Sequence, residues 1–329
     1  MRDFIHRFYP YQALKLMLQR IRPAVRSGKR IGPVSSEPMS PSASNPTHVW
    51  PQHQERAPEP FDPVATQVQL VTYFRALKQI ASQEQDHDRL RQSVTQQQLG
   101  FHLEISPSKI PNAGLGVFLK RHTHRNEKSL PAGSIVAMYP GTLYRPGEAI
   151  FFNSIHNRYI LKCQDGVYVD GKAKGLSGWI FRSVNGRDNY PGITPTADTT
   201  WMLDWSAFFT TAAAQRAGAK TCDSIGTACL KNPLAVGQII NNGTRLFPPN
   251  VRYQELDLRT RECPLELQEF LPNIWYSGDW HAHDQVTEDE DKVDWDQRSQ
   301  SDLDHLRTVV LVTTRTIEQD EELYSTYIE

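Results

Sequence analysis

The stretch "VVLVTTRTIEQDEELYSTYIE", residues 309–329, carries the strongest information about the fold. It opens with a β-branched apolar run, which is typical of a buried strand. It then passes through an acidic turn and reaches Tyr324 and Tyr327. Residues near a terminus are usually polar and frayed, so two aromatic rings at this place are informative. Taken alone, the pattern predicts a last strand anchored by its rings, although a tyrosine can also line a channel.

Two earlier stretches raise the same choice between packing and ligand binding. In "GQIINNGTRLFPPN", residues 237–250, an apolar pair runs directly into Asn241 and Asn242. These amides either cap a turn, which asparagine favours, or face a polar ligand. In "NAGLGVFLKR", residues 112–121, a Gly-x-Gly precedes an apolar pair. Its glycines would let the backbone approach a ligand, but alone they indicate only a tight turn.

The second half of the chain has the pattern of a mainly β domain. Short apolar runs such as "GSIVAMYPGTLY" and "YILKCQDGVYVDG" are separated by Gly, Pro and Asn. Helical patterns do not alternate with them, which disfavours a doubly wound parallel sheet. We expect an α+β, mainly β domain over residues 101–329. Two stretches have the composition of insertions, near 204–231 and, strongly acidic, near 279–305.

Three segments precede this domain. Residues 1–30 are basic with one acid and predict an amphipathic helix. Residues 31–60 are rich in Pro and Ser and read as a linker, because they cannot bury enough apolar surface to order themselves. Residues 61–100 predict a helical segment that starts at Asp62 as N-cap and fades near Gln98. The residues expected on its buried face are Val64, Val68, Val71, Phe74 and Leu77.

Composition narrows the classes of function and the compartment. The 36 Lys and Arg residues nearly balance the 37 Asp and Glu residues, so direct binding of nucleic acid is not expected. No apolar run is long enough for a membrane helix, and no secretory leader is recognisable. We expect an intracellular protein, nuclear or cytoplasmic, while the Arg-rich start leaves a mitochondrial presequence open. The composition does not indicate an oligomeric state.

A metal site is not expected. The four cysteines form no C-x-x-C pair, and the two His-x-His pairs, at 122–124 and 281–283, lie in polar stretches. The acidic run at 288–304 lacks the glycine and spacing of a calcium loop. It is expected to be a solvated loop, or alternatively to steer a basic substrate toward the site.

Taken together and in order, the three motif stretches resemble the SET-domain methyltransferases. In that family Gly-x-Gly comes first, then Asn-His-Ser-Cys-x-Pro-Asn, then Glu-Glu-Leu-x-x-x-Tyr. The corresponding stretches here are Gly114-Leu115-Gly116, Asn241-Asn242 with Pro249-Asn250, and Glu321-Glu322-Leu323 with Tyr327. The stretches "MYPGTLY", "VDGKAKG", "RSVNGRD" and "NPLAVGQ" look closest to one subgroup of the family. The resemblance implies small β-sheets with a knot-like threading of the C-terminal segment, preceded by N-terminal helices.

The resemblance also implies a cofactor, a reaction and a set of site residues. The cofactor would be S-adenosylmethionine, and the substrate a protein that presents a lysine, methylated by an in-line (SN2) transfer to its deprotonated amine. Asn241 would bind the methionyl end, and backbone groups of Asn242 the adenine. Tyr327 would be the catalytic residue that orients the amine. The implied cofactor contacts are Gly114, Leu115, Gly116, Tyr139, Asn241, Asn242 and Tyr327.

Several departures from the family pattern keep alternatives open. Asn242 replaces the family histidine, and the turn that follows is longer than usual. The small Ser325 stands where a Phe or Tyr often limits the number of methyl groups, so the degree of methylation is open. The cysteine-rich segment that often closes the adenine side does not follow Tyr327. A competing alignment places Asn185 of "RSVNGRD" in the middle motif. A catalytically silent SET-fold binding module is the alternative function.

Overall fold

The computed structural model describes residues 61–81, 87–121, 129–187, 197–205, 225–276 and 305–326. The predicted helix at 1–30 and the linker at 31–60 lie outside these ranges, as do both His-x-His pairs and Tyr327. Contacts divide the chain into two units, and α5 (Phe151–Ser154) belongs to the smaller one. All other elements named below belong to the larger unit. None of the helices in the described part is long and apolar enough to cross a bilayer.

The larger unit contains four α-helices and three short 3₁₀ helices among its described residues. The α-helices are α3 (Pro63–Ala81), α4 (His87–Leu99), α6 (Gly175–Arg187) and α9 (Leu265–Gln268). The 3₁₀ helices are η1 (Thr200–Met202), η2 (Thr227–Cys229) and η3 (Gly237–Ile239). The strands are β1 (His102–Pro107), β2 (Leu115–Lys120), β3 (Ser129–Leu130), β4 (Ile135–Met138), β5 (Gly141–Tyr144), β6 (Ile160–Lys162), β7 (Tyr168–Asp170), β8 (Ile225–Gly226), β9 (Asn241–Asn242), β10 (Val251–Arg259), β11 (Asn273–Trp275), β12 (His305–Thr313), β13 (Ile317–Glu318) and β14 (Tyr324–Ser325).

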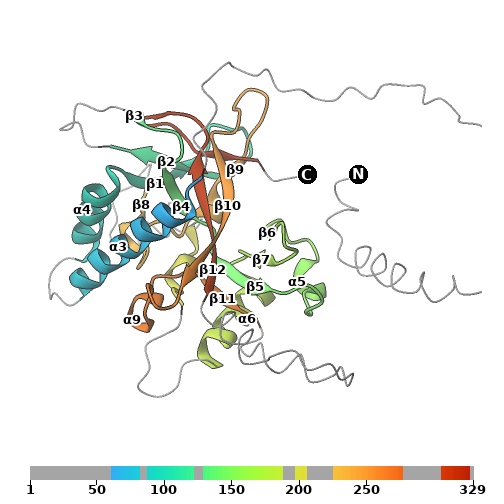
Figure 1. The fold of residues 1–329 in the computed structure, drawn as a ribbon. Coiled ribbons are helices and arrows are strands. Elements are labelled where there is room, and N and C mark those ends of the chain that lie inside the picture. Colours follow the sequence, from blue (N-terminus) through green and yellow to red (C-terminus); the bar gives the residue numbers. More distant parts are fainter. Residues whose placement is uncertain are drawn as a thin grey trace, which may run out of the picture. The chain divides into compact units, whose positions relative to one another are not determined.

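These strands form small sheets, which confirms the predicted α+β, mainly β class. The sheet orders are β2-β1-β8, β4-β12-β10-β14-β9, β11-β5-β7-β6 and β13-β3. The long antiparallel pair β10–β12 runs side by side through the centre (Figure 1). The strands expected in "YILKCQDGVYVDG" are the antiparallel pair β6–β7, and those in "GSIVAMYPGTLY" are β4 and β5. The range 204–231, whose composition suggested an insertion, includes β8, which pairs with β1.

The C-terminal stretch lies between two segments from earlier in the chain. On one side Phe118 of β2 bridges Glu322, and the Leu323 amide donates to the Val117 carbonyl at 2.8 Å. On the other side β14 pairs in parallel with β9 and with the start of β10. This arrangement agrees with the expected insertion of the C-terminal segment. The knot-like crossing itself stays a prediction, because 277–304 and 327–329 lie outside the described chain.

Helix α3 starts where the sequence predicts, and three of the five residues expected on its buried face, Val71, Phe74 and Leu77, are buried. The Asp62 carboxylate accepts hydrogen bonds from the amides of Val64 and Ala65, at 2.9 and 3.1 Å, and so caps the helix. The prediction that Val64 and Val68 are buried is wrong, since they are 67% and 56% exposed. The apolar stripe at 3.6-residue spacing runs instead through Leu70, Tyr73, Phe74, Leu77 and Ile80. Both valines fall on the other side of the helix.

The helical segment contributes to the main core and does not sit apart from it. Leu70, Tyr73 and Phe74 are 0% exposed, and the Phe74 ring stacks on Phe270 with centroids 5.9 Å apart. The same core contains the strands that carry the motifs, including β2, β4 and β12. A smaller cluster forms around Phe181 and Trp201, where α6 and η1 meet. The motif segments therefore rest on a continuous packed interior.

Candidate functional site

The Gly-x-Gly motif closes the hairpin between β1 and β2. Gly114 has φ +80°, a left-handed conformation that favours glycine. Its carbonyl accepts a hydrogen bond from the Ser108 amide at 2.8 Å. A Cβ added to Gly114 would meet nothing within 4 Å, so its backbone faces open space. A Cβ added to Gly116 would lie 2.1 Å from Oε1 of Glu322. The two glycines therefore have different roles, a turn at 114 and a close approach at 116.

Asn241 is held against this hairpin by its side chain. Its Nδ2 donates to the Leu115 carbonyl at 2.8 Å and approaches Glu322 Oε1 at 3.5 Å. Both of these groups are acceptors, so the atom that faces them is the amide nitrogen. Oδ1 therefore points away from them, and it accepts no hydrogen bond from any described residue. Asn241 is half-buried, which leaves this oxygen available to a ligand.

The neighbouring Asn242 lies at the parallel pair of β9 and β14. Asn241 is opposite Tyr324 and Asn242 opposite Ser325, and the Gly243 amide donates to the Ser325 carbonyl at 2.7 Å. The Asn242 side chain is exposed. This pairing places the middle motif beside the last one. The competing assignment is disfavoured, because Asn185 lies on α6 while Asn241 pairs with the C-terminal motif.

Glu322 is a buried carboxylate on which four donors converge. It is 0% exposed. The Ser108 hydroxyl donates to Oε1 at 2.6 Å, and the Lys109 amide donates to Oε2 at 2.7 Å. The Tyr324 hydroxyl also donates to Oε2, at 2.7 Å. Burial raises the pKa of the Tyr324 phenol, and the Glu322 carboxylate raises it further, so this phenol keeps its proton and donates. The fourth donor is the longer contact from Asn241.

Asn250 fixes the C-terminal stretch from the opposite side. It is 0% exposed, and its Nδ2 donates to the Glu322 carbonyl at 2.8 Å and to Glu321 Oε1 at 3.0 Å. Its Oδ1 accepts a hydrogen bond from the Tyr324 amide at 2.7 Å. The longer turn that precedes Asn250 places Phe247 against the Tyr324 ring, with centroids 5.6 Å apart. The "PN" of the middle motif is thus an anchor for the last motif.

Beside the contacts between the three motifs, which we call the motif junction, lies a wall of tyrosine rings. Tyr139 is 0% exposed and donates from its hydroxyl to the Tyr159 carbonyl at 2.8 Å. Its ring meets Tyr253 edge-on, with centroids 5.6 Å apart. The Tyr253 hydroxyl lies 3.1 Å from Ser325 Oγ, which in turn approaches the Asn241 carbonyl at 3.4 Å. The room expected beside the small Ser325 is therefore partly occupied by the Tyr253 hydroxyl.

Most of the site residues predicted from sequence come together. A chain of contacts connects the Gly-x-Gly hairpin, Asn241, Ser325, Tyr253 and Tyr139. Tyr327 lies outside the described residues, two positions after Ser325, so its role stays a prediction. Sequence reasoning did not single out Tyr253 or give a role to Glu322 or Asn250. The last two stood inside quoted motifs, and the signal for Tyr253 was only its place three residues after Asn250.

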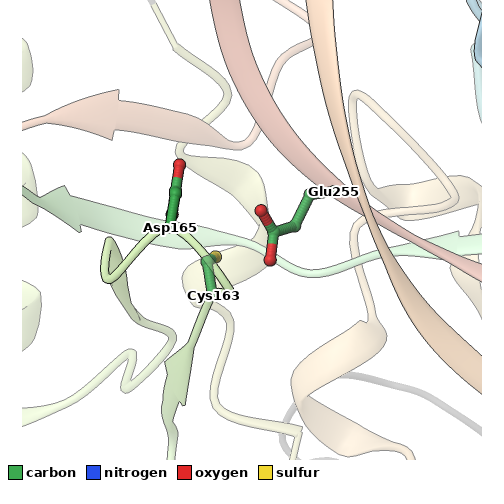
Figure 2. Close-up of side chains that lie close together, drawn as sticks. All are labelled: Cys163, Asp165 and Glu255. Carbon is green, nitrogen blue, oxygen red and sulfur yellow. The ribbon is translucent and has the colours of Figure 1, made fainter.

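A separate cluster brings together groups that could bind a metal. Ligand atoms of Cys163, Asp165 and Glu255 lie within 4.8 Å of one another, and Figure 2 shows the Cys163 thiol and the Glu255 carboxylate facing each other. Arg307 already binds both acids, Asp165 at 2.8 Å and Glu255 at 2.9 Å. Burial and the adjacent acids raise the pKa of the Cys163 thiol to about 12, so the thiol holds its proton at neutral pH. We interpret this cluster as an ion-pair network that joins the β6–β7 hairpin to β10 and β12.

The residues present fit a group that carries an amine. The Asn241 side-chain oxygen, which has no partner among the described residues, offers an acceptor. The backbone of Gly114 faces open space, and Gly114 directly precedes Leu115, whose carbonyl binds the Asn241 nitrogen. One hollow is lined by residues of α4, β1, β8 and η2 and another by residues of α4, and neither lining includes a residue of the three motifs.

Comparison with known proteins assigns the class. No family model matches the chain. Two curated proteins do match it, each 34% identical over 259 residues, or 78% of this chain, and both carry a SET domain in their names. The chain therefore belongs to the SET-domain family. Both relatives are named SET domain-containing protein 9, one from Pongo abelii, 75% of whose length is covered, and one from Homo sapiens, with 69% covered.

Proposed function

We propose that the chain is an S-adenosylmethionine-dependent methyltransferase that acts on lysine side chains of proteins. The observation that carries this proposal is the parallel pairing of β9 with β14, which sets Asn241 and Asn242 beside the motif that leads to Tyr327. Membership of the SET-domain family supports the reaction class. The contact between Asn241 and the Leu115 carbonyl adds the first motif to the same site.

The chain's own groups would hold the cofactor from two sides. The Asn241 side-chain oxygen would accept a hydrogen bond from the methionyl amine, because its nitrogen is already engaged. Backbone groups near Gly114 would contact the cofactor where no side chain intervenes. When bound, S-adenosylmethionine supplies an electrophilic methyl group. The protein contributes mainly by orienting the two reactants, which lowers the entropic part of the barrier.

The substrate amine must lose its proton before it can react. A free lysine has a pKa near 10.4, and an apolar wall disfavours its charged form. The rings of Tyr139 and Tyr253 form such a wall beside Ser325. Tyr327 would accept or donate a hydrogen bond at the amine and so direct its lone pair. The partner is therefore a protein segment that presents a lysine to this wall.

Replacing Tyr327 tests the reaction. We expect Tyr327→Phe to keep cofactor binding within about threefold and to lower methyl transfer by about 100-fold or more, the range typical of a lost positioning and acid–base group. Transfer of labelled methyl from S-adenosylmethionine to protein and peptide pools measures the activity, and calorimetry measures binding. Tyr168→Phe on β7 is the matched control, because the same hydroxyl is removed from a residue that does not belong to the junction.

The same measurements distinguish the proposed enzyme from the alternative function. A parent chain that binds the cofactor but transfers no label to any pool would support a silent SET-fold binding module. Equal transfer by Tyr327→Phe and the parent chain would contradict the role of this tyrosine. A chain that shows no binding heat at millimolar S-adenosylmethionine would contradict the proposed function as a whole.

A further inference from the structure

We infer that Glu322 is a positioning residue, which fixes the orientation of the Asn241 carboxamide so that its oxygen faces the cofactor. The inference rests on the proposed function. It assigns to Glu322 no contact with substrate or cofactor, since its side chain is fully buried. Among the side chains expected to bind the cofactor, Glu322 contacts Asn241 alone. Its effect on cofactor binding therefore passes through Asn241.

The first step of the argument is the direction of the amide. An asparagine side chain can turn by half a revolution about its last bond and exchange its oxygen and nitrogen. Here one amide atom faces both the Leu115 carbonyl and Glu322 Oε1. The reversed orientation would bring the Asn241 oxygen against two acceptors. The carboxylate and the carbonyl together therefore exclude the reversed orientation.

The second step is that Glu322 itself has no freedom to move. Each of its oxygens is bound by a short hydrogen bond from the loop that precedes Gly-x-Gly, through Ser108 and Lys109. The Tyr324 hydroxyl adds a third. Oε1 occupies the place that a Cβ at position 116 would take. The second glycine of the motif thus makes room for the carboxylate, which in turn orients the asparagine of the middle motif.

Replacement by glutamine is the most selective perturbation. Glu322→Gln keeps the volume but converts one acceptor into a donor. The backbone amide of Lys109 can only donate, so the new oxygen is needed at the Oε2 position. The new amide group then faces Ser108, whose hydroxyl can turn and accept, and Asn241, whose nitrogen cannot. The conflict falls on the Asn241 side chain, which must shift or reverse.

The experiment measures binding of S-adenosylmethionine and of S-adenosylhomocysteine by calorimetry on the full chain. We expect Glu322→Gln to weaken both by about tenfold, in line with the loss of one hydrogen bond of about 1.4 kcal/mol. Equal loss is expected because the methionyl amine is common to both compounds. Selective loss for the positively charged S-adenosylmethionine would overturn the inference, since it would indicate that the charge of Glu322 acts directly.

The matched control is Glu321→Gln, the same change at the adjacent residue. Glu321 binds Asn250 and Arg315 and does not touch Asn241. We expect it to keep both dissociation constants within about twofold of the parent values, because Glu321 makes no contact with Asn241. A folded Glu322→Gln that binds like the parent, or a control that loses as much affinity as Glu322→Gln, would overturn the inference alone. A parent chain that binds neither compound would overturn the proposed function.

Discussion

At the scale of single residues, the site depends on complementary sizes and on the direction of amides. The Glu322 carboxylate occupies the space that a Cβ at position 116 would take. Only glycine therefore fits at position 116. Asn250 uses both ends of its amide to hold the last motif, while Asn241 uses one end and leaves the other exposed. The two asparagines therefore have opposite characters, the first structural and the second suited to a ligand.

Tyr253 is expected to limit how many methyl groups one amine receives. Its hydroxyl lies beside Ser325, where added methyl groups would need room. We expect Tyr253→Phe to remove this hydroxyl, to keep the ring packed on Tyr139, and to shift products toward di- and trimethyl-lysine. Mass spectrometry of methylated peptides, with Tyr168→Phe for comparison, measures the distribution. An unchanged distribution at equal turnover would contradict this assignment.

Sequence reasoning located the contacting motifs but not the atoms that join them. Asn241 stood out as an amide directly after an apolar pair, and the glycines gained weight from their order with the two later motifs. The partner of Gly116 could not be read from the sequence, because the contact with Glu322 joins residues far apart in the chain. The same holds for Tyr253, whose hydroxyl acquires meaning only beside Ser325. Long-range side-chain contacts leave no local pattern.

At the scale of elements, the periodicity of apolar residues predicted the secondary structure well where a strand or helix is long. The pattern of β12 and the cap of α3 are observed as expected. The buried face of α3 was predicted in part, since Val71, Phe74 and Leu77 are buried as expected, whereas Val64 and Val68 are exposed. The two-residue strands β9 and β14 are defined by their pairing with other segments, β9 with β14 and β14 also with β10. Neither has enough residues for a periodic signal.

Glu269, directly after α9, should make stability depend on pH. Burial raises its pKa, but hydrogen bonds from Lys78 on α3 and from Lys231 outweigh this and lower the pKa below its ordinary value. A lowered folded-state pKa gives stability that is present above the unfolded value, near 4.3, and is lost as the pH falls through the folded value. The link between α3 and α9 should therefore weaken in acid.

Urea unfolding of Glu269→Gln at several pH values tests this expectation. We expect the free energy of unfolding at pH 7 to fall by about 2 kcal/mol, the usual loss for hydrogen bonds to a charged group. The difference from the parent should shrink as the pH falls through the lowered folded-state pKa, because the parent carboxylate then takes up a proton. Glu266→Gln on the exposed side of α9 is the control. A difference that stays constant from pH 7 to pH 3 would contradict the assigned ion pairs.

At the scale of the whole molecule, the helical segment belongs to the same interior as the sheets. The sequence predicted a helix over 61–100 but not its partners, because an apolar stripe does not identify the surface that covers it. The structure supplies the partner, since Phe74 stacks on Phe270 and Lys78 binds Glu269. The small sheets, which share no strand among the described residues, are joined through this core rather than through one continuous ladder.

Two truncations test the integration of this segment. Six buried apolar side chains of α3 would each contribute about 2 kcal/mol, so removing the helix takes about 12 kcal/mol from a typical total of about 5–15 kcal/mol. We expect removal of residues 1–100 to abolish cooperative thermal unfolding, and removal of residues 1–60 to preserve it. Calorimetry of both chains gives the answer. A cooperative transition in the shorter chain would show that the β domain folds without α3 and α4.

The insertion of the stretch from Ile317 to Ser325 between β2 and β9 has a consequence for biosynthesis. This stretch leaves the ribosome after every segment that it touches. Strands β2 and β9 must therefore remain without this stretch until it has been synthesised. Contacts so distant along the chain close slowly, and nascent intermediates with unpaired edges need protection from aggregation. Chaperone dependence during synthesis thus follows from the position of one short segment.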